Sequence, residues 1–353
     1  MNILIASANG YGNAGDDICA VVSQEFARMC NKKNKVKVTA PPFDEKLAEW
    51  ADAIILGGGG IIYDANKENM ENYLAYMDYA MKHGKKAIGL GLGEQGIVTK
   101  DGEKRYKEAF NKMDLLTMRA QGDVDRLKKF GVKTAVATQD LGFGFDYSHY
   151  HRKAQKNRGG RKPKLGVVLS NQEHLVNDLK LAFSKEEKVN ALQFKNSFEK
   201  NIEHITSAFD VTVITQSRDD LEMAELYKRE YGVRTYSYHK THELHKLLRL
   251  YAKQDLVITQ RFHGMVYSMM IGVPVIVLGY HGQKQHKFLS DLGFAKRLLA
   301  YHEPKKLEHL LHHLSLGSKE LSKVVVKITD KQRSDLREQA LQNQKMLCET
   351  LSQ

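Results

Sequence analysis

The sequence predicts an α/β protein made of two doubly wound domains whose parallel sheets face a cleft. Short apolar segments alternate with helical segments on both sides of a basic stretch at residues 147–164. Such alternation is typical of doubly wound parallel sheets. A chain of 353 residues with 42% hydrophobic content also favours two domains over a single core.

The first domain is expected over residues 1–146. Met1 begins an apolar run without a basic start or a cleavage site, which indicates a first strand rather than a signal peptide. Further along, apolar runs and helical patterns follow one another. Strands are expected at 2–7, 36–39, 53–56, 86–92, 115–118 and 134–137, and helices at 16–30, 70–82, 104–112 and 123–130.

The alternation stops at residues 147–164, which have no apolar period and which we interpret as a basic linker. A second domain is expected over 165–327. Its strands are expected at 165–169, 211–215, 233–236, 256–259 and 275–278, and its helices at 221–231, 242–253 and 307–314. The segment 328–353 is expected to form an amphipathic helix that packs back on the first domain.

Composition limits the classes of function. The net charge of +12 and the pI near 9.3 indicate an anionic partner or a basic surface that aids solubility. No zinc finger, recognition helix or RNP-type pattern is present, so nucleic acid is not expected as a partner. The three cysteines, Cys19, Cys30 and Cys348, show no paired or metal-ligand spacing. A reduced, cytoplasmic setting is therefore expected.

The first candidate motif follows the first strand, at Gly10 to Asp17, and opens the first helix. Glycines allow the backbone to turn tightly and to approach a ligand. The motif lacks the dinucleotide fingerprint and the phosphate loop. Adjacent acids beside glycines suit hydroxyl binding or acid/base chemistry, although Asp16 could instead cap the helix. The candidate residues are Gly12, Asn13, Gly15 and Asp16.

Two further glycine motifs follow predicted strands. Four glycines in a row weaken any regular element, so residues 57–60 predict a close backbone approach to a ligand or to the other domain. The stretch 89–96 is either a glycine-rich turn or a part of the site, with Glu94 and Gln95 at the same edge. The candidate residues are Gly58, Gly59, Gly60, Glu94 and Gln95.

Basic residues follow three other strands. Arg119 lies between a strand and a helix, where an ion-pair role is the simpler alternative. Arg261 and His263 are expected on one face of a strand end, followed by a helix that opens at Gly264. Tyr280 and Lys284 are expected in the loop after the next strand. Because strand ends and helix N-termini converge at one edge of a parallel sheet, this cluster predicts an anion site.

In combination, these motifs resemble the polysaccharide pyruvyltransferase family. The family's N-terminal signature G-x-G-N-x-G-D is similar to residues 10–16, its glycine run to residues 57–64, and its C-terminal signature to residues 261–284. The match runs in order over roughly residues 3 to 295. Ala120 and Asp123 stand where the family usually has an acidic residue and a serine, and the loop from Tyr280 to Lys284 is one residue longer.

The resemblance implies a GT-B-like fold of two Rossmann-like domains, with phosphoenolpyruvate as donor and a sugar diol as acceptor. The acceptor is expected to be a cell-surface polysaccharide or a lipid-linked oligosaccharide precursor, with no cofactor and no metal. We expect Arg119, His263 and Lys284 to hold the donor, supported by Arg261 and Tyr280. His263 is the candidate general acid, and Asp16, or else Glu94, is the candidate base. The acceptor side is expected to include Asn13, Gln95 and the candidate glycines Gly12, Gly15, Gly58, Gly59 and Gly60.

Two other classes of function fit parts of the sequence. A nucleotide-sugar glycosyltransferase would share the two-domain architecture, with Glu303 as the acidic residue that binds a ribose. A non-catalytic protein could use the basic linker to bind a polyanion or a membrane surface. The charge is also compatible with peripheral contact at the inner face of a membrane, and the sequence is compatible with a homo-oligomer.

Overall fold

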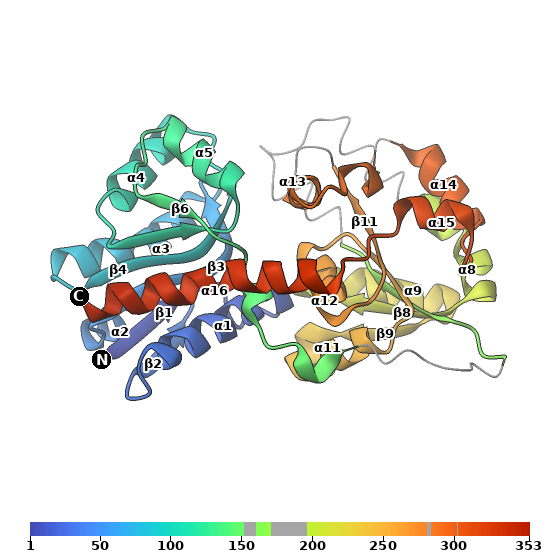
Figure 1. Cartoon of the computed structure of the whole chain (residues 1–353), viewed down its shortest axis with the longest axis horizontal. Coiled ribbons are helices and arrows are strands. Elements are labelled where there is room, and N and C mark those ends of the chain that lie inside the picture. The colour runs from blue at the N-terminus through green and yellow to red at the C-terminus, as the bar shows by residue number, and fades with distance from the viewer. Residues whose placement is uncertain (152–159, 171–195, 281–283, 302) are drawn as a thin grey trace. The chain divides into compact units, whose positions relative to one another are not determined.

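The computed structural model describes residues 1–151, 160–170, 196–280, 284–301 and 303–353. These residues form two compact units (Figure 1). The first comprises Met1–Phe145 and Ser334–Gln353, and the second comprises Asp146–Arg333. Each unit has its own sheet and its own apolar core, so each is described by itself.

The first unit contains a six-stranded sheet in which every pairing is parallel, in the order β2-β1-β3-β4-β5-β6. Both faces are covered, which explains the almost continuous apolar runs of the central strands. The strands are β1 (Asn2–Ala6), β2 (Lys35–Thr39), β3 (Ala53–Tyr63), β4 (Lys86–Gly96), β5 (Leu115–Met118) and β6 (Ala135–Ala137). The helices are α1 (Ala14–Cys30), α2 (Glu45–Trp50), α3 (Lys67–Lys82), α4 (Lys100–Phe110), α5 (Gln121–Lys129) and the short η1 (Leu141–Gly144).

Strands β3 and β4 extend through the glycine motifs instead of ending before them. The expected ends at Leu56 and Leu92 are therefore wrong. Glycine is needed here because neighbouring side chains lie directly against the backbone and leave no room for a Cβ atom. A Cβ on Gly57 would lie 2.6 Å from Ile5, and one on Gly58 would lie 2.6 Å from Cys19 of α1. The glycines let α1 pack directly on the sheet.

The second unit repeats the architecture with a parallel sheet in the order β12-β11-β10-β7-β8-β9. The strands are β7 (Lys164–Val168), β8 (Asp210–Thr215), β9 (Arg234–Ser237), β10 (Leu256–Thr259), β11 (Val275–Gly279) and β12 (Leu299–Ala300). The helices are α8 (Ile202–Ala208), α9 (Leu221–Tyr231), α10 (Tyr238–Thr241), α11 (Leu244–Ala252), α12 (Phe262–Ile271), α13 (Lys284–Asp291), α14 (Pro304–His312) and α15 (Lys319–Val324), with η2 (Ser148–Tyr150), η3 (Arg218–Asp220) and η4 (Ala295–Arg297) as single turns.

The C-terminal helix α16 (Asp330–Ser352) contributes its residues from Ser334 onward to the first unit. Its buried Asn343 side chain is fixed to the end of the first sheet by three contacts. Asn343 Oδ1 accepts from Thr117 Oγ1 at 2.6 Å and from Thr138 Oγ1 at 2.8 Å, and Asn343 Nδ2 donates to Gln139 O at 3.0 Å. Leu336, Ala340 and Leu347 are buried on the same helix.

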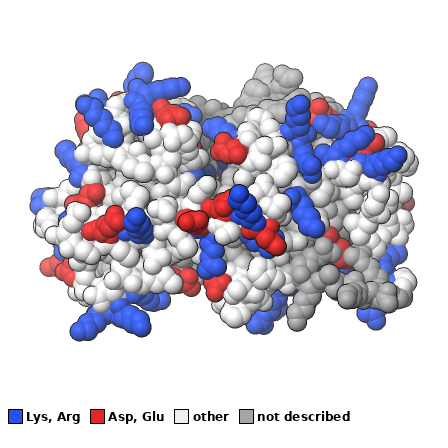
Figure 2. Space-filling model, viewed as in Figure 1, with Lys and Arg blue, Asp and Glu red and all other residues white. Residues whose placement is uncertain are grey.

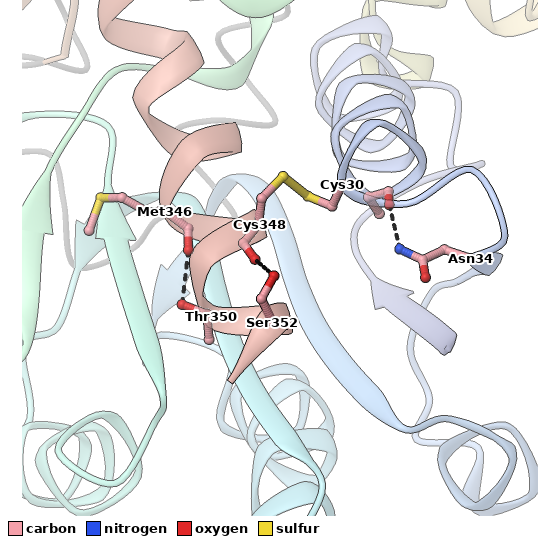
Figure 3. The surroundings of a disulfide bond; sticks show 7 residues. Cys30, Asn34, Met346, Cys348, Thr350 and Ser352 are labelled. Carbon is pink, nitrogen blue, oxygen red and sulfur yellow. Dashed lines mark hydrogen bonds between the residues drawn. A yellow bond between two sulfur atoms is a disulfide. The ribbon is translucent and has the colours of Figure 1, made fainter.

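A disulfide joins Cys30, the last residue of α1, to Cys348 of α16 (Figure 3). The expectation that the cysteines are unpaired is therefore wrong for these two, whereas Cys19 is a buried thiol. Sequence spacing could not reveal the pair because the two residues are 318 positions apart. The cysteine pattern consequently no longer supports a reducing compartment.

Lys and Arg side chains project in separate groups on the face shown in Figure 2, with Asp and Glu among them. The net positive charge is thus spread over this face rather than gathered in one continuous surface. None of the described helices combines the length and the apolar composition needed to span a bilayer.

Candidate active site

Each sheet has one point at which the direction of chain progression reverses. In the first sheet it lies between β1 and β3, and in the second between β7 and β10. Open α/β sheets bind ligands beyond the carboxyl ends of the strands at such a point. The Gly10–Asp17 motif follows β1, and Arg261 with His263 follows β10, so the sequence motifs lie at the switch points of their own units.

Asn13, rather than Asp16, caps α1. Asn13 Oδ1 accepts from Gly15 N at 3.0 Å, and Asp17 Oδ1 accepts from Gly10 N at 2.8 Å. The turn uses a positive φ of 78° at Gly12, which glycine adopts without strain. The capping alternative for Asp16 is therefore wrong, and its half-buried carboxylate points elsewhere.

The Asp16 carboxylate lies against the glycine run of β3. A Cβ on Gly59 would be 2.9 Å from Asp16 Oδ1, and Gly59 has a φ of 82°. The negative charge of Asp16 also reaches two tyrosines: burial first, and then Asp16, raise the pKa of Tyr73, and Asp16 contributes to the raised pKa of Tyr63. Sequence reasoning missed these tyrosines, which place hydroxyl groups in the field of the candidate base.

Glu94 and Gln95 both lie at the end of β4, as expected, but on opposite faces. Gln95 is exposed, and its Nε2 donates to Gly60 O at 2.7 Å. Glu94 is buried; its carboxylate accepts from Ile97 N at 2.8 Å and lies 3.4 Å from Arg126 Nη1. Burial raises the pKa of Glu94, an effect that Ile97 and Arg126 only partly oppose.

Arg119 follows β5 and is almost completely buried. Its Nη1 lies 3.5 Å from Oδ2 of Asp140, a side chain that is 0% exposed. The guanidinium rests on β4: a Cβ on Gly93 would lie 2.3 Å from the central guanidinium carbon. The ion-pair alternative is thus realised, and the pair gives Arg119 a fixed position. Asp140 also accepts from Gly142 N at 2.9 Å, which caps η1.

Arg261 is the N-cap residue of α12, which begins at Phe262 and not at Gly264. The expectation that Arg261 and His263 share a strand face is therefore wrong, because the strand ends at Thr259. Arg261 Nε donates to Oδ2 of Asp220 at 3.1 Å, and its Nη2 donates to the other oxygen of the same carboxylate. Asp220 is 0% exposed, so it orients the guanidinium bidentately.

His263 lies in the first turn of α12 and is half-buried. Its ring meets the Phe262 ring edge-on at 5.5 Å and lies 6.1 Å from the Tyr267 ring. The first turn of a helix presents N–H groups that favour an anion. A histidine at this place can therefore share a bound anion with the helix terminus.

Lys284 is the first residue of α13 rather than a loop residue; residues 281–283 of the expected loop lie outside the described residues. Two contacts bring this helix to the start of α12. Gln285 Nε2 donates to Gln260 O at 2.9 Å, and the Phe262 and Phe288 rings lie 5.8 Å apart. The segments that carry Arg261, His263 and Lys284 therefore meet at one edge of the second sheet.

Tyr280 directly follows β11 and is buried, with its ring 4.7 Å from that of Tyr301. Its ring therefore belongs to the core beneath this edge. Glu303, the residue that would bind a ribose in a nucleotide-sugar enzyme, precedes α14, and its carboxylate lies 3.1 Å from Lys306 Nζ. The structure thus groups Arg261, His263 and Lys284 in one unit and Asp16, the β3 glycines, Gln95 and Arg119 around the other sheet.

Comparison with known proteins adds a family match. A family model described as polysaccharide pyruvyl transferase matches residues 13–282 of the chain. This range includes every candidate residue of the pyruvyltransferase interpretation except Gly12 and Lys284. No curated protein matches the sequence.

Two solved structures share the fold at low identity. The UDP-GlcNAc 2-epimerase from Neisseria meningitidis, bound to UDP-GlcNAc, has a TM-score of 0.56 and 11% identity, with 99% of each chain covered. A protein from Listeria monocytogenes assigned as a UDP-N-acetylglucosamine 2-epimerase has a TM-score of 0.53 and 11% identity, with 98% of this chain and 94% of that chain covered. With the two six-stranded parallel sheets, these matches confirm the predicted GT-B-like α/β class.

Proposed function

Since the chain belongs to the polysaccharide pyruvyl transferase family, which is a family of enzymes, we propose that it transfers the pyruvyl unit of phosphoenolpyruvate to a sugar diol. The acceptor would be a cell-surface polysaccharide or its lipid-linked precursor. The product would be a pyruvate ketal, with phosphate released. The observation that supports this proposal is the contact, at one edge of the second sheet, between the segment with Arg261 and His263 and the helix that begins at Lys284.

Phosphoenolpyruvate carries a carboxylate and a phosphate, which match a guanidinium, an imidazole and an ammonium. Asp220 supports this use because it fixes the orientation of the Arg261 guanidinium, and the Arg261 side chain keeps 20% of its surface exposed. Lys284, which is exposed, contributes an ammonium charge to the group. In the proposal these groups bind the donor.

The reaction balances without an oxidant or a reductant. A proton is added to the methylene carbon, a sugar hydroxyl oxygen bonds to the adjacent carbon, and the bond from that carbon to the phosphate oxygen breaks. The second hydroxyl then bonds to the same carbon and closes the ketal. The two hydroxyls lose one proton each: one proton is accounted for in the new methyl group and the other in the released hydrogen phosphate. His263 is proposed as the general acid and Asp16 as the general base. Glu94 is the alternative base, and its raised pKa suits proton transfer.

A thermal-shift titration tests the donor. Phosphoenolpyruvate should raise Tm, because a ligand at about 100 times its Kd stabilises a protein by about 2.7 kcal/mol. Lys284→Ala should abolish the shift, while Lys287→Ala, which removes the same charge from an exposed position of α13, should retain it. A shift with UDP- or GDP-sugars but none with phosphoenolpyruvate would favour the glycosyltransferase alternative instead.

The catalytic assignment is tested separately by phosphate release with candidate sugar diols. His263→Ala should lower kcat by about 100-fold or more while leaving the Lys284-dependent thermal shift detectable. Wild-type turnover by His263→Ala would remove His263 from the reaction. We propose a cytoplasmic location for this reaction, where the disulfide between Cys30 and Cys348 would be exposed to cellular reductants.

A further inference from the structure

A groove opens at the amino-terminal ends of β7, β8 and β9 in the second unit. Its volume is about 770 Å³. The strands begin at Lys164, Asp210 and Arg234, and all three residues line the groove. Because the strands are parallel, this edge of the sheet is opposite to the one followed by Arg261 and His263. The groove is therefore separate from the candidate active site.

Four cationic side chains line the groove with one carboxylate: Arg161, Lys162, Lys164 and Arg234 against Asp210. Arg234 forms an ion pair with Asp210, and both side chains are substantially exposed. The remaining three cations have no acidic counterpart in the lining. The lining as a whole is thus positive by three charges.

The carboxyl termini of nearby helices explain the presence of only some of these cationic side chains. The carboxyl terminus of a helix attracts cations, and both α8 and α9 end at the groove. Lys162 Nζ donates to Thr206 O of α8 at 2.9 Å, and α9 has Lys228 and Arg229 in its own last turn. Within the described part of the chain, no ion pair involves Arg161 or Lys164. The carboxyl ends of α8 and α9 therefore do not account for the charges of Arg161 and Lys164.

The rest of the lining is partly apolar. Phe209, Val211 and Val233 lie beside the half-buried ring of Tyr231. Arginine and lysine together are suited to the oxygens of a phosphate, and an aromatic and aliphatic wall suits the organic part of an ester. We propose that the groove binds the phosphate group of a phosphate ester. A lipid headgroup and a free metabolite share this chemistry.

Two probes distinguish these sources. Vesicles of equal parts phosphatidylglycerol and phosphatidylcholine present the ester on a membrane, and glycerol 3-phosphate presents it in solution. Binding of the full chain is measured by flotation in the first case and by calorimetry in the second, with pure phosphatidylcholine vesicles as the blank. We expect binding in at least one arm, and a weakening of about tenfold in the double variant R161Q/K164Q, because two charge-assisted contacts are lost.

The matched control is K305Q/K319Q, which removes two charges from exposed positions of α14 and α15 in the same unit and should bind like the wild type. Binding by vesicles alone identifies a lipid ester, and binding of glycerol 3-phosphate identifies a free one. The proposal is overturned if neither probe binds, if both double variants weaken binding equally, or if single-stranded DNA binds while both phosphate probes fail. The phosphoenolpyruvate shift described above is expected in both double variants, so the two proposals fail independently.

Discussion

Two completely buried aspartates hold the two arginines of the candidate sites. Asp140 lies beside Arg119 in the first unit, and Asp220 binds Arg261 bidentately in the second. A buried ion pair adds little net stability, but its orientation is fixed, and the loss of one partner leaves an uncompensated charge. Each arginine is thus held in one position before any ligand arrives.

The Asp220→Asn variant tests this arrangement. Removal of the buried carboxylate should lower the free energy of unfolding by about 3 kcal/mol, because the Arg261 guanidinium loses its counter-charge. Asp210→Asn breaks an arginine pair of the same unit whose side chains are 61% and 39% exposed; it should cost less than about 1 kcal/mol. Equal losses in urea unfolding of the two variants would contradict the positional role of burial.

Glu94 predicts a dependence of stability on pH. Its pKa is raised in the folded state by burial, so the folded chain holds the proton more tightly than the unfolded chain does. Ionisation of Glu94 therefore disfavours folding at pH values above the raised pKa, and this penalty disappears as the pH falls through it. Glu94→Gln should be at least as stable as the wild type at pH 8.

The measurement is urea unfolding from pH 8 to pH 4, with Glu108→Gln at an exposed position of α4 as the matched control. The advantage of Glu94→Gln over the wild type should shrink as the pH falls. A variant that is less stable than the wild type at pH 8 and recovers nothing in acid would show that the Ile97 and Arg126 contacts outweigh burial.

The sequence predicted which residues lie at the ends of the strands better than it predicted the contacts of those residues. The motifs correctly indicated which side chains follow β1, β5 and β10, since those strands have apolar runs. The partners Asp140 and Asp220 had no local signal, because they are distant in the sequence from the arginines that they bind. The cap of α1 was assigned to Asp16 as an alternative, but Asn13 lies three residues earlier and reaches Gly15 N.

At the scale of elements, glycines were the main source of error. Glycine has a low strand propensity and usually weakens a strand. Strands β3 and β4 nevertheless continue through their glycine motifs. Packing overrides propensity here: a Cβ on Gly60 would lie 1.3 Å from Gln95 Nε2, and one on Gly93 would overlap Arg119. The same glycines therefore make the candidate site possible.

Helix α16 depends on one polar residue for its position on the first unit. Asn343→Leu should lower the free energy of unfolding by about 3 kcal/mol, because the Thr117 and Thr138 hydroxyls and the Gln139 carbonyl lose a partner that is shielded from water. Gln342→Leu, at an exposed position of the same helix, should change it by less than about 0.5 kcal/mol. Hydrogen exchange under reducing conditions should show faster exchange in α16 only for the first variant; protected α16 amides would contradict the prediction.

At the scale of the whole molecule, alternation of strands and helices was sufficient to predict two doubly wound domains. Most of the strands contain a buried apolar run and are followed by a helix, so the spacing of apolar residues changes from the strand pattern to the helix pattern along the sequence. Strand order is different, since it depends on which edges pair and not on any local pattern. The two switch points, which concentrate the candidate residues in each unit, became visible only with the sheet orders.

The bond between Cys30 and Cys348 has a topological consequence. The bridged residues are 318 positions apart, and the entire second unit, from Asp146 to Arg333, lies between them. The chain is therefore a covalent ring with two short tails. A protease that cuts once anywhere in the second unit opens this ring but releases no fragment, and the two pieces separate only after the sulfur bridge is reduced.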